Sequence, residues 1–399
     1  MNIHIILYIV TAIVCIFLAF RVYLKVKHPF WSQQPVFHYY NIKYWLAPPG
    51  IISKDPPSLS KYVNDLNVKF HTINDTPDSL FTRCVAFIKS NYMRTKMCNY
   101  IPDIKHVKPY FEGHLYKSFV SSYMDSEVSR DIQKGSIVTD RIMGIMTTRP
   151  VYLIHKKRKR PVYYVDYLCV GKSDRRRDIA PMVIQTHHYH QRREEPSIHV
   201  SMFKREGALT NIVPLCAYPT RTFEIGNVLQ DWRKPNLSTF RIVPVSNNIE
   251  LIERMIHSAY KQTPYVIHSN LINIQRLIET NNIHTFCLHD GEEPIGMFFL
   301  RNMMCSYDGG YTVSLFASIG VDDVRDAMAW GAMESLKILA KTKGYQHVCI
   351  EEVGDTISWL DLAVGRIGVR DSCPPSPTAY YMYNFGMRPI AAKDITIVL

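Results

Sequence analysis

A basic segment that directly follows an apolar strand constrains the fold of this chain more than any other feature. Residues 163–170 are dominated by β-branched and aromatic side chains and are followed by Gly171, so they predict a strand that ends there. The residues after this break predict a helix that runs to about Arg193, with Asp178 as its N-cap and Pro181 in its first turn. The segment therefore predicts a strand joined to a helix by a short loop.

The loop between this strand and this helix is strongly basic. Lys172 and three consecutive arginines, Arg175, Arg176 and Arg177, surround the expected start of the helix. A helix N-terminus offers unpaired N–H groups and the positive end of the helix dipole, which together suit a phosphate group. A solvated basic loop explains the same residues, so the spacing alone leaves both interpretations open.

Further strands and helices are predicted on both sides of this segment. Strands are expected at 137–149 and 151–155, separated by Pro150, and at 197–203, 239–244 and 311–318. Helices are expected at 77–92, with Thr76 as the N-cap and Pro77 as the first helical residue, and at 249–260, 271–280 and 322–343. The pattern restarts after Pro235, which suggests two stacked, similar halves, although no internal sequence repeat supports them.

Four stretches resemble N-myristoyltransferases and follow one another in the order of that family. Residues 165–184 are similar to its Phe-Leu-Cys-Val strand end, basic loop and Ala-Pro, and 28–36 to its Phe-Trp-x-x-Gln-Pro-Val signature. Residues 339–345 are similar to a helix end in the second half of the family. Residues 380–384, followed by an apolar run that ends at Leu399, are similar to its C-terminus. The resemblance covers nearly the whole chain.

The resemblance implies an α/β (α+β) fold in which two pseudo-symmetric GNAT-like halves surround a mixed, saddle-shaped sheet. The expected divisions are an N-terminal membrane anchor over 1–24, a first half with the acyl-CoA site over 25–236, and a second half with the peptide site over 237–399. The predicted restart after residue 235 agrees with this division.

The resemblance also implies an activity, the transfer of a myristoyl group from myristoyl-CoA to the N-terminal glycine amine of a protein or peptide. In the family, two backbone N–H groups stabilise the oxyanion, and they correspond here to Tyr167 and Leu168. The base in the family is the C-terminal carboxylate, which here belongs to Leu399. The apolar residues 396–399 favour a buried carboxylate with a raised pKa, but a terminal strand that only completes a sheet explains them equally.

Myristoyl-CoA is expected as a co-substrate, with no permanently bound cofactor and no metal. The residues implied to contact it are Phe30, Trp31, Lys172, Ser173, Arg175, Arg176, Arg177, Ile179, Ala180 and Pro181. The chain departs from the family at Asp178, which replaces a usually basic residue, and on the peptide side at 203–207 and 371–377. Two alternatives therefore stay open: a membrane protein that keeps the fold without the activity, and an acyltransferase that modifies another amine, such as a lysine.

Residues 5–20 form an uninterrupted apolar run, which is unusual for this family. Extended to Leu24, the run reaches the roughly 20 residues that a membrane-spanning helix needs. A cleaved signal peptide is the alternative, but no Lys or Arg precedes the run and no small-x-small cleavage site follows it. Arg21, Lys25 and Lys27 follow the run, so the positive-inside rule predicts a single-pass anchor with the body in the cytosol.

Charge and cysteine content limit the partners and the compartment. A net charge of +12 favours anionic partners such as phosphate groups or acidic lipids. Nine scattered cysteines without a C-x-x-C pair predict free thiols in a reducing compartment. The Lys/Arg run at 156–160 resembles a nucleic-acid patch, but a solvated hairpin tip explains it better, so no nucleic-acid partner is expected.

Three other groups of polar residues are candidates for chemistry. His187 and His190, with Glu194 one turn later, offer a minor alternative as a metal site, which neighbouring arginines disfavour. Cys169 lies in the apolar strand and is expected to be a small core residue rather than a nucleophile. The acidic pair at 351–352 is expected at a solvated strand end rather than as a general base.

Overall fold

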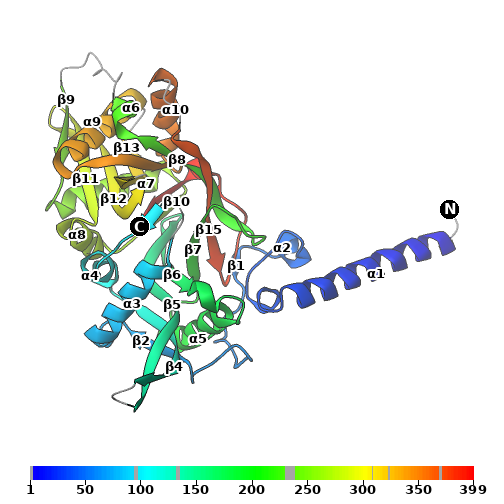
Figure 1. Ribbon diagram of the computed structural model, residues 1–399. Coiled ribbons are helices and arrows are strands. Elements are labelled where there is room, and N and C mark those ends of the chain that lie inside the picture. The colour runs from blue at the N-terminus through cyan, green and yellow to red at the C-terminus, as the bar shows by residue number, and fades with distance from the viewer. Residues whose placement is uncertain are drawn as a thin grey trace.

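The computed structural model of the chain describes residues 3–93, 98–131, 135–229, 239–307, 309–321, 324–367 and 371–399. In this part of the chain, helix α1 (Ile3–Lys27) projects away from a mixed α/β body (Figure 1). The stretch His4–Lys27 has a mean hydropathy of 2.7 in its most apolar window, none of which is buried, so by length and composition it is able to cross a membrane. A signal sequence has the same properties, so the retained anchor stays a prediction.

The body is built on a mixed sheet of fifteen strands in the described residues. Its first half contains β2 (Val68–Thr72), α3 (Asp78–Asn91), β3 (Cys98–Tyr100), α4 (Ile104–Val107), β4 (Phe119–Asp131), β5 (Gly135–His155), β6 (Arg158–Val170), α5 (Ile179–Glu194), β7 (Ser201–Glu206) and β8 (Pro214–Glu224). Its second half contains β9 (Phe240–Pro244), α7 (Ile249–Gln262), β10 (Tyr265–His268), α8 (Leu271–Glu279), β11 (Ile283–Asp290), β12 (Glu293–Tyr307), β13 (Gly310–Gly320), α9 (Arg325–Lys343), β14 (Tyr345–Glu351), α10 (Thr356–Ile367) and β15 (Cys373–Tyr383). Strand β17 (Ile395–Val398) ends the chain.

The two halves repeat the same order of elements and the same strand pairing. In the first, β4, β5 and β6 are antiparallel neighbours, and β6 pairs in parallel with β7 after helix α5. In the second, β11, β12 and β13 are antiparallel neighbours, and β13 pairs in parallel with β14 after helix α9. Each half also pairs strands with the other: β3 and β8 of the first half pair with β12 and β14, and β10 and β15 of the second half pair with β5 and β7. The expected pseudo-symmetric pair of α/β halves is therefore confirmed.

The sheet opens in the first half where β6 leaves β7. These strands pair only over Tyr163–Val165 and Ser201–Phe203. At the same point the register of β5 and β6 shifts, so that Asp166 and Tyr167 together oppose Thr147. Such a β-bulge bends a strand and redirects its side chains. The end of β6, residues 166–170, therefore does not pair with β7.

Pro150 does not divide two strands, and the prediction of separate strands at 137–149 and 151–155 was wrong. Strand β5 is continuous from Gly135 to His155. Along one edge, β5 pairs with β4 up to Thr148 and with β10 from Tyr152 onward. Pro150 falls in the gap between these two partners, where a missing N–H interrupts no pairing on that edge.

Other predicted boundaries shift by a few residues. Helix α3 begins at Asp78, and the Thr76 hydroxyl donates to the Thr72 carbonyl (2.7 Å) instead of capping the helix. Strand β7 begins at Ser201 rather than residue 197. The hairpin between β5 and β6 turns at Lys156 and Lys157, as predicted for the basic run. The predicted helix start at 322–323 lies outside the described residues.

The arm at residues 28–60 packs on the body but is not wholly extended. It forms a 3-10 turn at Trp31–Gln33, helix α2 (Ile42–Leu46) and strand β1 (Gly50–Ile51), which pairs with β16 (Phe385–Gly386). The buried Asn384 side chain donates to the carbonyls of Ser53 and His199 at 2.8 and 2.9 Å. These bonds hold the arm against the end of β15.

Candidate functional site

A cavity of about 720 Å³ lies where β6 separates from β7. One part of its wall is apolar and includes Trp31, Met146, Val165, Leu168 and Ile184. Another part carries charge and includes Asp166, Lys204, Glu206, Arg301 and Glu351. This volume is in the range of small-molecule and cofactor sites, and the division suits a ligand with an apolar chain and a polar reacting end.

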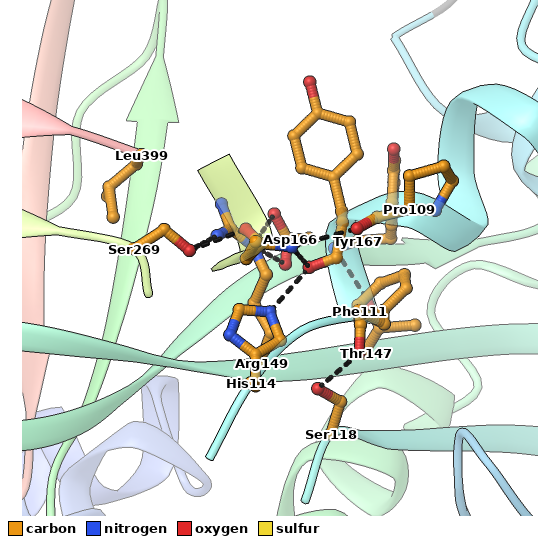
Figure 2. A network of polar contacts seen from close by, with 12 residues as sticks. Pro109, Phe111, His114, Ser118, Thr147, Arg149, Asp166, Tyr167, Ser269 and Leu399 are labelled. Atoms are coloured by element: carbon orange, nitrogen blue, oxygen red, sulfur yellow. Dashed lines mark hydrogen bonds and ion pairs between the residues drawn. The ribbon is translucent and has the colours of Figure 1, made fainter. Parts of the chain in front are cut away.

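The bulge of β6 forms part of the cavity wall. Tyr167 and Leu168, the two predicted oxyanion donors, both line the cavity. The Tyr167 N–H already donates to the Thr147 hydroxyl at 3.2 Å (Figure 2). The Tyr167 hydroxyl lies 3.0 Å from that of Tyr100. A ligand oxyanion that accepts a hydrogen bond from the Tyr167 N–H would have to share this donor with the Thr147 hydroxyl or displace that hydroxyl.

The basic loop before α5 is organised around Asp174, which is buried. The Arg141 guanidinium donates to both carboxylate oxygens of Asp174 at 2.9 and 3.0 Å, and the side chains of Ser173 and Arg177 also donate to it. The bond from Arg141 holds the pKa of the Asp174 carboxyl below its usual value. Ser173 and Arg177 are therefore already engaged within the loop, whereas the family resemblance implied that both contact CoA.

The start of helix α5 leaves backbone donors available. Asp178 occupies the predicted N-cap position with a φ of 56°, but its side chain makes no capping hydrogen bond. In the described part of the chain, the N–H groups of Ile179 and Ala180 have no hydrogen-bond partner. A Cβ at Gly144 would lie 2.8 Å from the Ile179 side chain, so this glycine lets the helix start approach β5. Together with the exposed Arg175, these groups offer an anion site at the surface.

Phe30 and Trp31 differ in their access to the cavity. Phe30 is buried in a core cluster with Tyr62 and Ile179, and its ring lies 5.2 Å from that of Tyr62. Trp31 lines the cavity and packs edge-on against Phe30 at 5.1 Å. Trp31 is thus placed to touch a ligand, and Phe30 supports it from behind.

A buried ion pair stands beside the bulge. The Arg149 Nε lies 3.0 Å from an Asp166 carboxylate oxygen, and the Arg149 Nη1 donates to the Ser269 hydroxyl at 3.0 Å (Figure 2). Burial raises the pKa of Asp166, and the Arg149 guanidinium opposes this effect. The pair connects the bulge of β6 to the end of β10.

The chain terminus lies in the middle of the body, between the two halves (Figure 1). Strand β17 pairs in parallel with β10, the Ser269 N–H donates to the Val398 carbonyl at 3.0 Å, and Leu399 is only 2% exposed. The expected burial of the terminus is present. The Arg301 guanidinium donates a hydrogen bond to the terminal oxygen of Leu399 and packs over the Phe316 ring. Among described residues, Arg301 lines the cavity and Leu399 does not.

A second charged group lies in the cavity wall at Lys204. Its Nζ is 2.8 Å from Glu206 Oε1 and 2.8 Å from Glu351 Oε1, while the Tyr218 hydroxyl donates to Glu351 Oε2. Burial by itself lowers the pKa of Lys204, but Glu351 and Glu206 outweigh it and hold that pKa well above its usual value. Lys204 in turn holds the pKa of Glu206 below its usual value. The prediction of a solvated strand end at 351–352 was wrong for Glu351, which is buried.

The histidines and Cys169 have structural partners. His187 is buried between the hydroxyls of Ser121 (2.8 Å) and Thr148 (2.9 Å), and His190 lies 2.7 Å from Asp65. Within the described ranges, no group of three acidic, His or Cys side chains is placed to hold a metal ion. Burial raises the pKa of the Cys169 thiol to about 12, which favours the unreactive thiol form.

The sequence matches no protein-family model and no curated protein. In fold, the chain is similar to Saccharomyces cerevisiae N-myristoyltransferase solved with bound myristoyl-CoA, with a TM-score of 0.65 and 13% identity over 93% of this chain and 99% of that chain. Another structure of that enzyme with myristoyl-CoA gives a TM-score of 0.68 at 12% identity, over 93% and 94% of the two chains. A third, with myristoyl-CoA and inhibitors, gives 0.64 at 13% identity. The expected fold is therefore confirmed.

Proposed function

We propose that this chain, which has the fold of N-myristoyltransferase, transfers a myristoyl group from myristoyl-CoA to the N-terminal glycine amine of a protein or peptide. The observation that carries the proposal is the cavity at the bulge of β6, with an apolar wall on one part and a charged wall on the other. The two reactants together have the same division. The thioester carries a long apolar chain on one side of its reacting carbonyl, and the polar acceptor approaches that carbonyl from the other side.

The donor is proposed to bind along β6 and the start of α5. Trp31, Met146, Leu168 and Ile184 supply apolar surface for the acyl chain. The N–H groups at the start of α5, together with the loop cations Lys172, Arg175 and Arg176, suit the phosphates of CoA through hydrogen bonds and charge. Arg177 contributes less directly, because Asp174 already holds it.

The proposed reaction needs no covalent intermediate on the protein. The acceptor nitrogen attacks the thioester carbonyl carbon, the C–S bond breaks, and the CoA sulfur leaves as the amide forms. The Leu168 N–H is proposed as one oxyanion donor, and the Tyr167 N–H as the other once its bond to Thr147 is shared. Loss of one such donor slows comparable reactions by about 100- to 1000-fold. The acceptor nitrogen must also lose a proton. For the Leu399 carboxylate to accept that proton, the Arg301 guanidinium must first break its hydrogen bond to Leu399.

The body is proposed to face the cytosol and to be held at a membrane by α1. The cations Arg21, Lys25 and Lys27 at the end of this apolar helix support that orientation. Acyl-CoA is used in the cytosol, so this location agrees with the proposed donor.

The proposal is tested with the full chain in detergent or lipid nanodiscs. Incubation with myristoyl-CoA and a glycine-initiated peptide is expected to give a myristoylated peptide, detected by mass spectrometry. The same peptide with an acetylated N-terminus and no lysine is the control and should stay unmodified. Absence of acyl transfer to any amine would refute the proposed activity.

One observation favours a second candidate function, the binding of acyl-CoA without turnover. The Arg301 guanidinium donates a hydrogen bond to the terminal oxygen of Leu399, and in N-myristoyltransferases the terminal carboxylate serves as the base. A protein of this kind is expected to bind myristoyl-CoA in a stoichiometric titration and to form no acylated product. The two candidates therefore differ in turnover and agree in donor binding.

A further inference from the structure

We propose that the arm around α2, residues 39–46, forms a surface that lies in the headgroup layer of the membrane that α1 enters. The body is then held against the membrane at two places, by α1 and by this surface. Its partner is a lipid surface that contains anionic headgroups. The inference rests on the proposed membrane location of α1 and is independent of the proposed acyl transfer.

Large apolar and aromatic side chains are exposed together in this arm. They are Tyr39, Tyr40, Ile42, Trp45 and Leu46, and we call these residues the arm face. Trp45 is 56% exposed and Leu46 is 79% exposed. A single exposed apolar side chain is common on a protein surface, whereas several close together indicate an interaction surface.

The arm face is held in place on the body. Tyr44, within α2, is buried, and the His38 Nδ1 lies 3.0 Å from the Asn211 carbonyl oxygen. The Trp45 indole N–H donates to the Tyr39 carbonyl at 2.9 Å. Because this N–H is already bonded within the arm, the indole ring can enter an apolar layer without leaving a polar group unpaired.

A contact with α1 gives the depth of the arm face. The rings of Phe20 and Tyr40 meet edge-on with their centroids 5.6 Å apart, and α2 lies beside the end of α1 that joins the body (Figure 1). The apolar core of a bilayer takes about 20 helical residues, so a span that begins near Ile5 ends near Leu24.

Phe20 precedes Leu24 by one helical turn, which is about 6 Å along the helix axis at a rise of about 1.5 Å per residue. Tyr40 therefore lies close to the boundary between the apolar core and the headgroups. Tyr and Trp side chains are enriched in this layer, because it suits rings that carry one polar group.

The charges beside the arm face suit anionic headgroups. Lys43 is exposed within α2. The exposed Arg388 packs its guanidinium over the Tyr44 and Trp45 rings, at 4.5 and 5.0 Å from their centroids, and donates to the Trp45 carbonyl at 2.7 Å. Lys and Arg next to a membrane-spanning helix are attracted to the acidic lipids of a cytoplasmic leaflet.

The sequence around the arm adds no negative charge that would oppose this attraction. Lys25 and Lys27 lie in the last turn of α1, and no Asp or Glu precedes Asp55. A second copy of the chain is a less suitable partner, because the net charge of +12 makes two copies repel each other. The position, the aromatic content and the charge of the arm face therefore all favour lipid.

The test measures the depth of Trp45 in the full chain, reconstituted in vesicles of phosphatidylcholine and phosphatidylserine. All other tryptophans are the same in the unmodified chain and in Trp45→Phe, so the difference between the two emissions gives the share of Trp45. Three quenchers are compared: lipid with bromine near the headgroup end of the acyl chains, lipid with bromine near their terminal methyl groups, and acrylamide in the water. Phenylalanine keeps an aromatic ring at this exposed position, so the variant is expected to fold.

A second chain that combines Trp45→Phe with Tyr311→Trp is the matched control. Tyr311 is also an exposed aromatic residue, but it lies in β13 and outside the arm. We expect most of the Trp45 emission to be lost with bromine near the headgroup end. Most of it should remain with acrylamide and with bromine near the methyl end. The emission from position 311 should be lost with acrylamide and should not respond to either lipid.

Quenching of Trp45 by acrylamide as strong as at position 311 would overturn the inference, because the arm face would then lie in water. Protection of Trp45 from all three quenchers would also overturn it, because a second copy or another protein would then cover the face. Stronger quenching by bromine near the methyl end would place Trp45 in the apolar core and contradict the depth derived from Phe20.

Flotation of the vesicles separates this inference from the proposed location of α1. A chain that floats with the vesicles while Trp45 lies in water refutes the arm face alone. A chain that does not float refutes both the membrane location and the arm face. Neither measurement uses acyl transfer, so failure of the proposed activity has a different signature, which is absence of acylated product.

Discussion

Replacing Asp174 with asparagine tests how the loop before α5 is held. The Asp174 carboxylate is 4% exposed and accepts two hydrogen bonds from Arg141, one from Ser173 and one from Arg177. Asparagine keeps the shape of the side chain but loses its charge. Its amide NH2 group is a donor and cannot accept a hydrogen bond from Arg141 or Arg177, which can only donate. The change therefore removes the anion around which three donors converge.

The expected cost follows from these bonds and from the exposure of the partners. Hydrogen bonds between charged groups contribute about 1.5–3 kcal/mol each when they are buried. Arg141 and Arg177 are 41% and 56% exposed, so solvent screens both ion pairs and lowers the contribution. We expect Asp174→Asn to lower the free energy of unfolding by about 2 kcal/mol at pH 7. For a chain of 399 residues, that corresponds to a fall in Tm of about 2 °C.

The pH dependence gives an independent check on the cause. The bond from Arg141 lowers the pKa of Asp174 in the folded protein. The stabilisation from a depressed carboxyl pKa is present above the unfolded value near about 3.9 and is lost as the pH falls through the folded pKa. Thermal unfolding of the original chain and of Asp174→Asn should therefore differ at pH 7 and converge as the pH falls below about 4.

Asp178→Asn is the matched control for this prediction. Asp178 lies in the same loop, but it makes no side-chain capping bond and has a positive φ of 56°, which asparagine tolerates well. We expect its Tm to stay within about 1 °C of the original, since surface changes of this kind are usually near neutral. Equal unfolding curves for Asp174→Asn, Asp178→Asn and the original chain at pH 7 would refute the assignment of Asp174 as the anchor of the loop.

Three other predictions address the donor site, the bulge and the membrane. Replacing Arg175 and Arg176 together with alanine should weaken acyl-CoA binding by about 10-fold and reduce its salt dependence, as measured by titration at two ionic strengths. Thr147→Val should lower the free energy of unfolding by about 1 kcal/mol but keep kcat within a few-fold, because the Tyr167 N–H stays available to the oxyanion; a tenfold loss of kcat would contradict this. A glycosylation acceptor inserted at the 156–157 hairpin tip should stay unmodified in membranes, whereas one at the N-terminus should be modified.

Local patterns in the sequence were enough for most elements, including the strand, chain break and helix that frame the proposed donor site. The strand at 163–170, the break at Gly171 and the helix after Asp178 are all present. Each depends on neighbouring residues only, through side-chain alternation, a chain break or a helix start. The apolar terminus at Leu399 was likewise expected to be buried, since it carries no charged tail.

The charged side of the site could not be predicted in this way. Lys204 and Glu351 are 147 positions apart, and Arg301 and Leu399 are 98 apart, so no local pattern links them. Glu351 was expected in solvent because a charged residue at a strand end usually lies there, and only the approach of β7 and β8 provides the partners that let it be buried. Pro150 was misread for a related reason, because the gap that accommodates it lies between two partner strands.

The sequence by itself determined where most strands and helices form, that basic residues precede the start of α5, and that the apolar residues near Leu399 form a strand. Only the tertiary structure decided that a cavity lies at the bulge of β6, that Arg301 bonds to the terminal oxygen of Leu399, and that Lys204 joins Glu206 and Glu351. The physical reason is that propensity and periodicity act over a few residues. The charge state and accessibility of a buried group depend instead on the segments that fold around it.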